Sequence, residues 1–470
     1  MIRVHGRRPR SSGRLVLSLL ASTALGVATV VLPSTSGALA AAGGGKLPVV
    51  IAWGKALQLP GTRPRTAVLS LSCSAPGDCG AGGTGFTDSE KNGKWGTASP
   101  VPGTGGLGVQ WSVSCASPGD CGAVGNRADA VYVATEKDGT WDRAEEVPGL
   151  GALGLHGNPV INALSCGGVG SCAAGGSYED RSHHTQAFVV TAKGGVWGKA
   201  QELPGLAALN KGGYSSLSAV SCASAGNCTG GGLFTDRKGA QQAFVVSQAG
   251  YKWQAATNLP GLPTRNKGAY ALVSAVSCPS PGNCGAGGIY TDGGFNNTAF
   301  VVSRSHGSWK SSLRLAGVNG LSAGPSVGID QISCSSAGNC GAGGFYTDAG
   351  GRQQAFVASE INGKWAAGEA VPGTVTANTG FSALTASVSC RSKGNCTAGG
   401  LFTLVSGHSV VFVVSEVNGT WGTAKDISGV GNSETLYSVS CTAPANCVAG
   451  LGAMPGFPGN SYVLAETPAH

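Results

Sequence analysis

Charge is scarce in this sequence. Of 470 residues only 11% are charged and 6% are aromatic, and the formal net charge is +8. Removing the five arginines of the first 14 residues, with no acidic residue beside them, lowers that charge to +3. This balance leaves no basic footprint for nucleic acid or for an anionic membrane surface. The 80 glycines, by contrast, indicate many turns and little helix.

Long apolar runs are equally rare. The one extended run, residues 15–32, follows the arginines and precedes Ala38-Leu39-Ala40, which is typical of a cleavage site. This order predicts a secretory signal peptide over residues 1–40 and a single domain over residues 41–470. An uncleaved membrane anchor is the alternative, although Ser, Thr and Gly interrupt the run. We expect no membrane association after cleavage, and the lack of a C-terminal sorting motif predicts an extracellular, released protein.

Every cysteine of the sequence belongs to a regularly spaced pair. All 16 cysteines fall in pairs separated by five residues, usually rich in Gly, Pro and Asn, as in a hairpin connection. In a secreted chain this pattern predicts one disulfide at each hairpin and no free thiol nucleophile. Metal binding by the cysteines is the alternative, but zinc sites favour closer spacing and supporting histidines. The predicted disulfides are Cys73–Cys79, Cys115–Cys121, Cys166–Cys172, Cys222–Cys228, Cys278–Cys284, Cys334–Cys340, Cys390–Cys396 and Cys441–Cys447.

Tryptophan gives a second count of the same repeat. Eight of nine tryptophans open a segment that typically ends in Leu-Pro-Gly or Val-Pro-Gly, and only Trp111 lies outside the series. Asn-Gly or Asp-Gly precedes several of them, as at Asn362-Gly363, and favours a type I′ turn between adjacent strands. The eight are Trp53, Trp95, Trp141, Trp197, Trp253, Trp309, Trp365 and Trp421.

Each repeat offers four short apolar segments bounded by turn residues, as in residues 275–317. Segment A ends at the first Cys, B starts at the second, C resembles Ala-Phe-Val-Val-Ser, and D contains the Trp. The chain begins with a lone D segment, residues 52–59, and ends with A, B and C, the last at residues 461–466. Joining the ends completes one four-stranded antiparallel sheet.

These repeats predict an all-β fold, an eight-bladed β-propeller closed by an N-terminal strand that completes the last blade. Seven blades is the rival count, because the first repeat has almost no connection between B and C. An open solenoid is the weaker alternative, since it would leave the strands at both ends unpaired.

The Ser-Val-Ser-Cys and Asn-Cys-x-Ala-Gly-Gly units resemble the Cys-paired propeller repeats of secreted actinobacterial proteins, most of which have no assigned function. The resemblance covers nearly all of the chain after residue 40. The hairpin at residues 415–421 is also distantly similar to the Asp-box turn of sialidase-type propellers. It departs from that motif because Asn418 is adjacent to the glycine. The resemblance implies the fold and leaves the function open.

In a propeller the A–B and C–D turns share one face, and the longer B–C and D–A connections share the other, where binding residues are expected. Two D–A loops there are near copies, and three B–C loops carry Thr-Asp. Tyrosine rings beside amides and charges are typical of surfaces that bind sugars or peptides. Alternatively, Thr-Asp closes local turns and the copies reflect duplication alone. The candidate ligand-binding residues are Lys211, Tyr214, Asp236, Arg265, Asn266, Lys267, Tyr270, Asp292 and Asp348, with Glu179 and Asp180 on the neighbouring repeat.

Residues in a pattern typical of catalysis are fewer. Glycoside hydrolysis usually needs two carboxylates across one bond, and Asp330 is the only acidic residue four positions before a first Cys. It faces either the central channel or solvent at a strand end. The histidines form no metal-ligand motif, and His183-His184 is typical of a solvated loop. The serine before each first Cys has no nucleophile motif, so its recurrence favours a structural role.

We therefore expect a secreted, monomeric, disulfide-stabilised propeller that binds a glycan or a cell-wall polymer. It needs no metal and no cofactor. An extracellular carbohydrate-active hydrolase or lyase, with Asp236, Asp292, Asp330 or Asp348 as its acids, is the first alternative. A protein-binding scaffold or inhibitor is the second.

Overall fold

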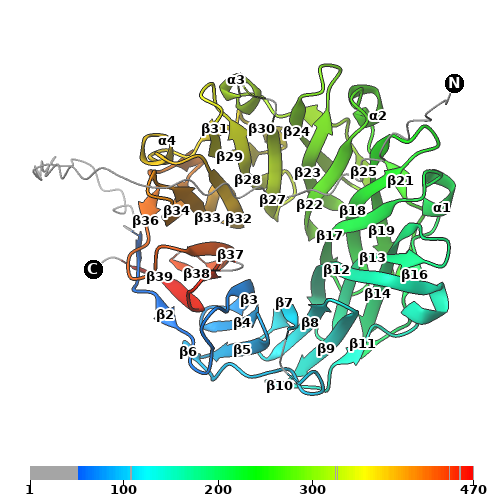
Figure 1. The fold of residues 1–470 in the computed structure, drawn as a ribbon, viewed down its shortest axis with the longest axis horizontal. Coiled ribbons are helices and arrows are strands. Elements are labelled where there is room, and N and C mark those ends of the chain that lie inside the picture. Colours follow the sequence, from blue (N-terminus) through cyan, green and yellow to red (C-terminus); the bar gives the residue numbers. More distant parts are fainter. Residues whose placement is uncertain are drawn as a thin grey trace, which may run out of the picture. The chain divides into compact units, whose positions relative to one another are not determined.

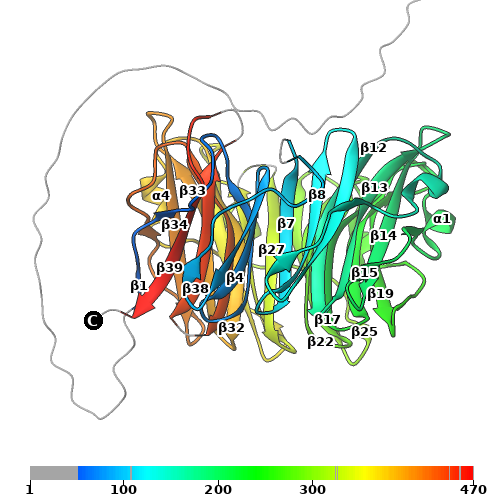
Figure 2. The same ribbon diagram turned by 90° about the horizontal axis from the view of Figure 1, so that it is seen from below.

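The computed structural model describes residues 51–105, 108–322, 324, 326–443, 445–454 and 457–468, so the predicted signal peptide lies outside the described residues. The described strands form eight antiparallel sheets, and Figure 1 shows these sheets as the blades of a ring. The eight-bladed propeller is thereby confirmed over seven blades. In Figure 2 the strands run between two opposite faces of the ring.

The first four blades consist of the following strands. Blade 1 contains β3 (Val68–Ala75), β4 (Asp78–Gly83), β5 (Phe86–Lys91) and β6 (Lys94–Trp95). Blade 2 contains β7 (Gln110–Ser117), β8 (Asp120–Arg127), β9 (Ala130–Lys137), β10 (Thr140–Trp141) and β11 (Glu145–Glu146). Blade 3 contains β12 (Leu155–Gly168), β13 (Ser171–Asp180), β14 (Thr185–Lys193), β15 (Val196–Trp197) and β16 (Gln201–Glu202). Blade 4 contains β17 (Ser215–Ser224), β18 (Asn227–Thr235), β19 (Gln241–Ala249), β20 (Lys252–Trp253) and β21 (Thr257–Asn258).

The other four blades follow the same order. Blade 5 contains β22 (Ala271–Ser280), β23 (Asn283–Thr291), β24 (Asn297–Ser305), β25 (Ser308–Trp309) and β26 (Leu313–Arg314). Blade 6 contains β27 (Val327–Ser336), β28 (Asn339–Thr347), β29 (Gln353–Ile361), β30 (Lys364–Trp365) and β31 (Glu369–Ala370). Blade 7 contains β32 (Ala383–Ser392), β33 (Asn395–Thr403), β34 (Ser409–Val417), β35 (Thr420–Trp421) and β36 (Lys425–Asp426). Blade 8 contains β37 (Glu434–Ala443), β38 (Asn446–Ala453), β39 (Tyr462–Pro468), β1 (Ile51–Trp53) and β2 (Leu57–Gln58).

The two ends of the chain close the ring as expected. Strand β1 pairs with β39 in antiparallel register, with Trp53 opposite Glu466, and β2 continues along the same edge of β39. The N-terminal segment thus supplies the outer strand of blade 8. An open solenoid is excluded, because these end strands are paired with each other.

A belt of serine hydroxyls joins neighbouring blades. The serine before each first cysteine accepts a hydrogen bond from the backbone N–H of the first cysteine in the next blade, at 2.9–3.0 Å in all eight cases. The belt is continuous across the closure, where Ser440 accepts from Cys73. All eight predicted disulfides form beside it. The structural role expected for these serines is confirmed.

The two faces of the ring differ in their connections. On the face that we call the short-turn face, each C–D turn bonds to the A–B turn of its blade, as when Gly363 N–H donates to the carbonyl of Gly338 at 2.7 Å. Asn362 and Gly363 have φ of 52° and 76°, as a type I′ turn requires. On the opposite, long-loop face, B–C loops bond to the D–A connections that follow, as when Gln353 N–H donates to Phe381 O at 3.0 Å.

The outer D segment of most blades consists of two short strands. In blades 2 to 7 a two-residue Trp strand is followed after a short gap by a second two-residue strand on the same C strand, as with β30 and β31 on β29. Blade 8 has the same arrangement, with the three-residue β1 and the two-residue β2 on β39. A one-turn helix follows before each of blades 3 to 7, after Pro-Gly or, before blade 6, after Ala316-Gly317. The glycine has a positive φ in each case, which glycine adopts readily, and a residue of the helix such as Leu206 is buried. These helices are η1 (Leu150–Leu153), α1 (Leu206–Leu209), α2 (Leu262–Arg265), α3 (Val318–Leu321) and α4 (Thr374–Ala377). Each described helix is thus far too short to span a membrane.

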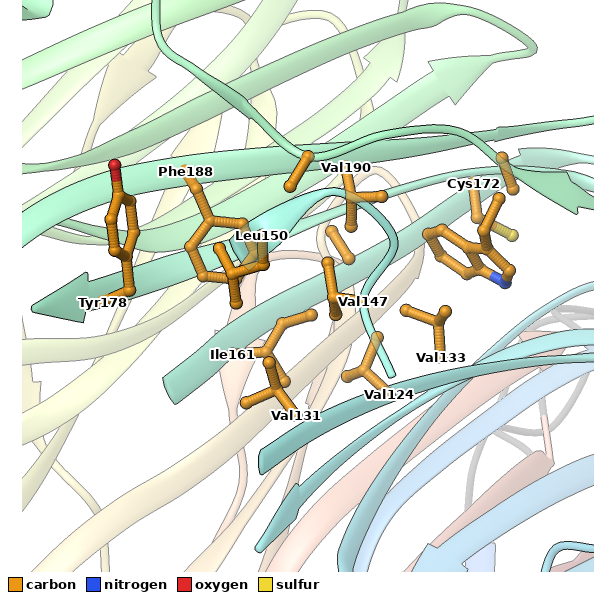
Figure 3. Packing of buried hydrophobic residues seen from close by; sticks show 14 residues of the cluster. Val124, Val131, Val133, Val147, Leu150, Ile161, Cys172, Tyr178, Phe188 and Val190 are labelled. Carbon is orange, nitrogen blue, oxygen red and sulfur yellow. The ribbon is translucent and has the colours of Figure 1, made fainter. Parts of the chain in front are cut away.

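The apolar core lies between adjacent blades. In the cluster of Figure 3, Val124 and Val133 of blade 2 pack with Phe188 and Val190 of blade 3, and all four side chains are at most 2% exposed. Similar clusters recur around the ring. In these clusters each blade is therefore stabilised by its neighbour.

Chains of hydrogen bonds between buried polar side chains link the outer strands of neighbouring blades. The indole N–H of Trp421 donates to Ser359 Oγ at 3.0 Å, and that hydroxyl donates to Glu416 Oε1 at 2.6 Å. Burial raises the pKa of Glu416. Other blades place a buried glutamate at the same position of the C strand, and burial raises the pKa of each of them, namely Glu136, Glu360 and Glu466.

Candidate functional site

The Thr-Asp loops of the long-loop face are closed by their aspartates. Asp236 Oδ1 accepts the backbone N–H groups of Lys238 at 2.8 Å and Ala240 at 3.0 Å, and Oδ2 accepts the amide of Gln242 at 3.1 Å. Asp292 and Asp348 close their loops in the same way. The structure thus gives all three carboxylates the role of turn formers.

The electrostatics of Asp348 agree with this role. Burial alone would raise the pKa of this carboxyl, but hydrogen bonds from Gln354 and from the backbone N–H groups of Arg352 and Gly350 bring it below its usual value. Arg352 also forms an ion pair with Asp348 at 3.1 Å. The carboxylate therefore stays ionised and bonded to its own loop.

The D–A loops divide into buried and exposed parts. Asn266 is buried and donates to the carbonyl of Gln241 at 2.8 Å and to Gln242 Oε1 at 3.0 Å. Its side chain therefore joins blade 5 to blade 4, as Asn378 joins blade 7 to blade 6. Arg265 and Lys267, on either side of Asn266, are exposed on the surface.

The two tyrosines of the copied loops differ in exposure. Tyr214 is 41% exposed, whereas Tyr270 is only partly exposed. Burial raises the pKa of the Tyr270 phenol, and Tyr214 is near enough to add to this shift. Tyr214 is therefore the more accessible ring of the pair.

A cavity of about 340 Å³ lies on blade 4, where these loops meet. Lys211 of the D–A loop and Asp236 of the B–C loop both line it, which brings together two residues predicted from the sequence. The sequence did not single out Arg237, Gln242 or Asn258, which also line it. Leu209 and Phe234 give the cavity apolar wall, so polar and apolar groups face the same space.

Two exposed phenylalanines lie on the same face and were also missed. Phe295 in the B–C loop of blade 5 is 76% exposed, and Phe381 in the D–A loop of blade 7 is 78% exposed. An aromatic residue at the centre of a loop such as Gly-Gly-Phe-Asn-Asn is the sequence signal that could have found Phe295. Together with Tyr214, these rings give the long-loop face accessible aromatic surface on three blades.

The acidic residues proposed for catalysis are dispersed. Asp236, Asp292 and Asp348 are each bonded within a different blade, while Asp330 lies on β27, the innermost strand of blade 6. Burial raises the pKa of Asp330 to about 7, a value that suits a general acid. The three loop carboxylates, however, serve their own turns.

We expect the free energy of unfolding of the protein to rise as the pH falls from about 8 to about 5. Burial raises the pKa of Asp88 to about 6 and that of Asp330 to about 7, whereas both have values of about 4 in an unfolded chain. The folded state therefore binds more protons in this window, and the free energy of unfolding rises as the pH falls. This contribution is complete below about pH 4 and is lost as the pH rises through about 7.

Denaturant midpoints at several pH values measure this effect. Asp88→Asn should reduce the difference between the midpoints at low and high pH. Asp129→Asn is the matched control, because its hydrogen bond to Arg127 lowers the pKa of that exposed carboxyl and places its titration below the window. A wild-type midpoint that falls on acidification from about pH 8 to about pH 5 contradicts the expectation.

Comparison with known proteins finds likeness only among solved structures. No protein-family model matches the chain, and no curated protein matches it. The GH74 xyloglucanase from Xanthomonas campestris matches at 13% identity with a TM-score of 0.48, over 87% of this chain and 63% of that chain. The Dos1 propeller matches at 10% identity with a TM-score of 0.49, and the match covers 88% of this chain and 95% of that chain. The fucose-specific lectin from Aleuria aurantia matches at 12% identity with a TM-score of 0.33, and the match covers 69% of this chain and 97% of that chain.

This chain therefore spans less than two thirds of the xyloglucanase. Likenesses at these identities and TM-scores carry no argument about ligand or reaction.

Proposed function

We propose that the protein is a secreted β-propeller that binds a glycan or a cell-envelope polymer through its long-loop face. The observation that carries this proposal is the cavity of about 340 Å³ on blade 4. Its volume is at the lower end of that of small-molecule sites and suits roughly one or two sugar units. The charges of Lys211 and Asp236 and the amides of Gln242 and Asn258 offer both donors and acceptors to sugar hydroxyls.

Exposed rings elsewhere on the long-loop face favour a polymer over a single sugar. Tyr214 belongs to the same loop as Lys211, and Phe295 and Phe381 continue the face across blades 5 and 7. The apolar C–H face of a sugar packs well against an aromatic ring. When one sugar unit of a polymer occupies the cavity, its other sugar units can contact these aromatic rings.

Binding without turnover is supported over hydrolysis. A glycosidase needs two carboxyl groups on either side of one bond, whereas the carboxylates of Asp292 and Asp348 each hold their own loop. The eight disulfides support an extracellular setting, since such bonds persist in oxidising compartments.

A binding screen with product detection tests the proposal. The oxidised protein, residues 41–470, is applied to arrays of glycans and cell-wall polymers, and soluble sugars released in the same wells are quantified. We expect saturable binding to at least one polymer without released product. Release of product that is lost in Asp330→Asn supports a hydrolase instead, and the absence of both signals directs the search to protein partners.

A further inference from the structure

Three side chains with metal-binding atoms meet on the long-loop face of blade 3. His156, Glu179 and His183 each offer one ligand atom, and these atoms lie within 4.8 Å of one another. Glu179 Oε1 is 2.6 Å from His183 Nδ1 and 3.5 Å from His156 Nδ1. The side chains of the histidines are 52% and 67% exposed, so an ion from solvent has access to the cluster.

The other blades show that this cluster departs from the repeat at three positions. In blades 4 to 7 a glycine replaces His156 and a threonine replaces Glu179, at the same distances from the first cysteine. A Cβ at any of those glycines would overlap the side chain of its threonine, so the two positions contact each other in these four blades. The pairs are Gly212 with Thr235, Gly268 with Thr291, Gly324 with Thr347, and Gly380 with Thr403. Blade 3 has changed both members of this contact.

The third departure is His183 itself. Its φ is 60°, and the equivalent residues of blades 4, 6 and 7 are Gly239, Gly351 and Gly407, which also have positive φ. The equivalent residue of blade 5 is Phe295, with φ of 61°. A side chain other than glycine is uncommon in this conformation. Blades 3 and 5 both hold a side chain in this unfavourable backbone conformation, and in blade 3 it is a histidine whose Nδ1 lies 2.6 Å from Glu179 Oε1.

The surrounding contacts hold the three residues in place. Tyr178 is fully buried, and its hydroxyl donates to the carbonyl of Leu153, which anchors the segment before His156 to β13. The Asn158 amide donates to Glu179 Oε2 at 2.9 Å and leaves Oε1 directed at the histidines. Asp180 Oδ1 accepts the backbone N–H groups on either side of His183, at 2.8 and 3.0 Å.

We propose that His156, Glu179 and His183 bind a zinc ion. Imidazole nitrogens with a carboxylate oxygen form a common three-residue zinc set, with ligand bonds of about 2.0–2.2 Å. The hydrogen bond between His183 and Glu179 gives way to two bonds to the ion. Because three protein ligands leave at least one position open, a water or an oxygen atom of a bound molecule can complete the coordination. The site extends the functional surface of the long-loop face from blade 4 to blade 3.

Calorimetric titration of the untagged, chelator-treated protein with zinc chloride tests the site. We expect one zinc ion to bind per chain, and Glu179→Gln and His183→Gly to weaken binding by at least about 100-fold. Calcium chloride should give no binding, because calcium prefers sites made of oxygen atoms. The matched control is His408→Ala, which removes an exposed histidine from the equivalent loop of blade 7 and should leave zinc binding unchanged.

Folding is followed in parallel by thermal unfolding without metal. His183→Gly restores the residue that three other blades have at this position, so we expect it to unfold at or above the wild-type temperature. Loss of zinc binding in this folded variant supports the proposal. Failure of the wild-type protein to bind zinc overturns it, as does zinc binding that both variants retain.

Discussion

A chain that begins at Gly61 is expected to lose the closed ring. Its β39 strand would lack both β1 and β2, and the backbone hydrogen bond from Leu59 to Ser461 would disappear. Leu59 is 1% exposed, and removal of such a side chain alone costs about 2–5 kcal/mol. The newly exposed edge of β39 would pair with other chains. We therefore expect oligomers or aggregates at concentrations where the full domain is monomeric.

Size-exclusion chromatography and thermal unfolding measure this effect. The matched control begins at Gly45 and keeps both N-terminal strands, so it should elute as a monomer and unfold cooperatively. If the chain that begins at Gly61 is also monomeric and unfolds at the same temperature, the strand pairing between the chain ends does not stabilise the ring as described.

Gly344→Ala is expected to destabilise the fold by more than about 3 kcal/mol. Gly344 lies on β28 opposite a bulge in β27, and a Cβ there would overlap the carbonyl oxygen of Gly328. The obstructing atom belongs to the backbone of β27, which is hydrogen-bonded to β28, so no change of side-chain rotamer can remove the overlap. The same carbonyl contact recurs in other blades, at Gly176, Gly232, Gly288 and Gly400.

Urea unfolding of the oxidised protein measures this destabilisation. Gly320→Ala is the control, because a Cβ at Gly320 in helix α3 meets no atom within 4 Å. Alanine also favours helix over glycine, so this variant should be neutral or more stable by about 0.5–1 kcal/mol. Equal stability of the two variants would mean that blade 6 can relax around the bulge.

The ring and its disulfides were predictable because their signals are local in sequence. The five residues between Cys334 and Cys340 are typical of a hairpin connection, and Asn362-Gly363 favours a tight turn between the C and D segments. The unpaired segments at the two ends then indicated closure. The broken D strand was not predictable, because nothing between Trp365 and Glu369 distinguishes a gap from a continuous strand.

The candidate site was only partly predictable because its residues come from separate segments. Lys211 and Asp236 were found as repeated loop residues, but the cavity that joins them also needs Asn258 and Pro263 from the connection to blade 5. Asn266 had the composition of a binding residue, and only its burial against Gln241 shows its role between blades. His156 lies far from His183 in sequence, so no motif joins them.

The most direct test of the account is a binding isotherm on the polymer that the array identifies. The variant Lys211→Ala with Asn258→Ala removes two cavity side chains, and Lys364→Ala with Ser308→Ala is its control on the short-turn face. We expect the cavity variant to bind at least about tenfold more weakly, a change of about 1.4 kcal/mol, and the control to bind as the wild-type protein does. Binding that survives in the cavity variant and fails in the control would place the ligand on the short-turn face and contradict the account.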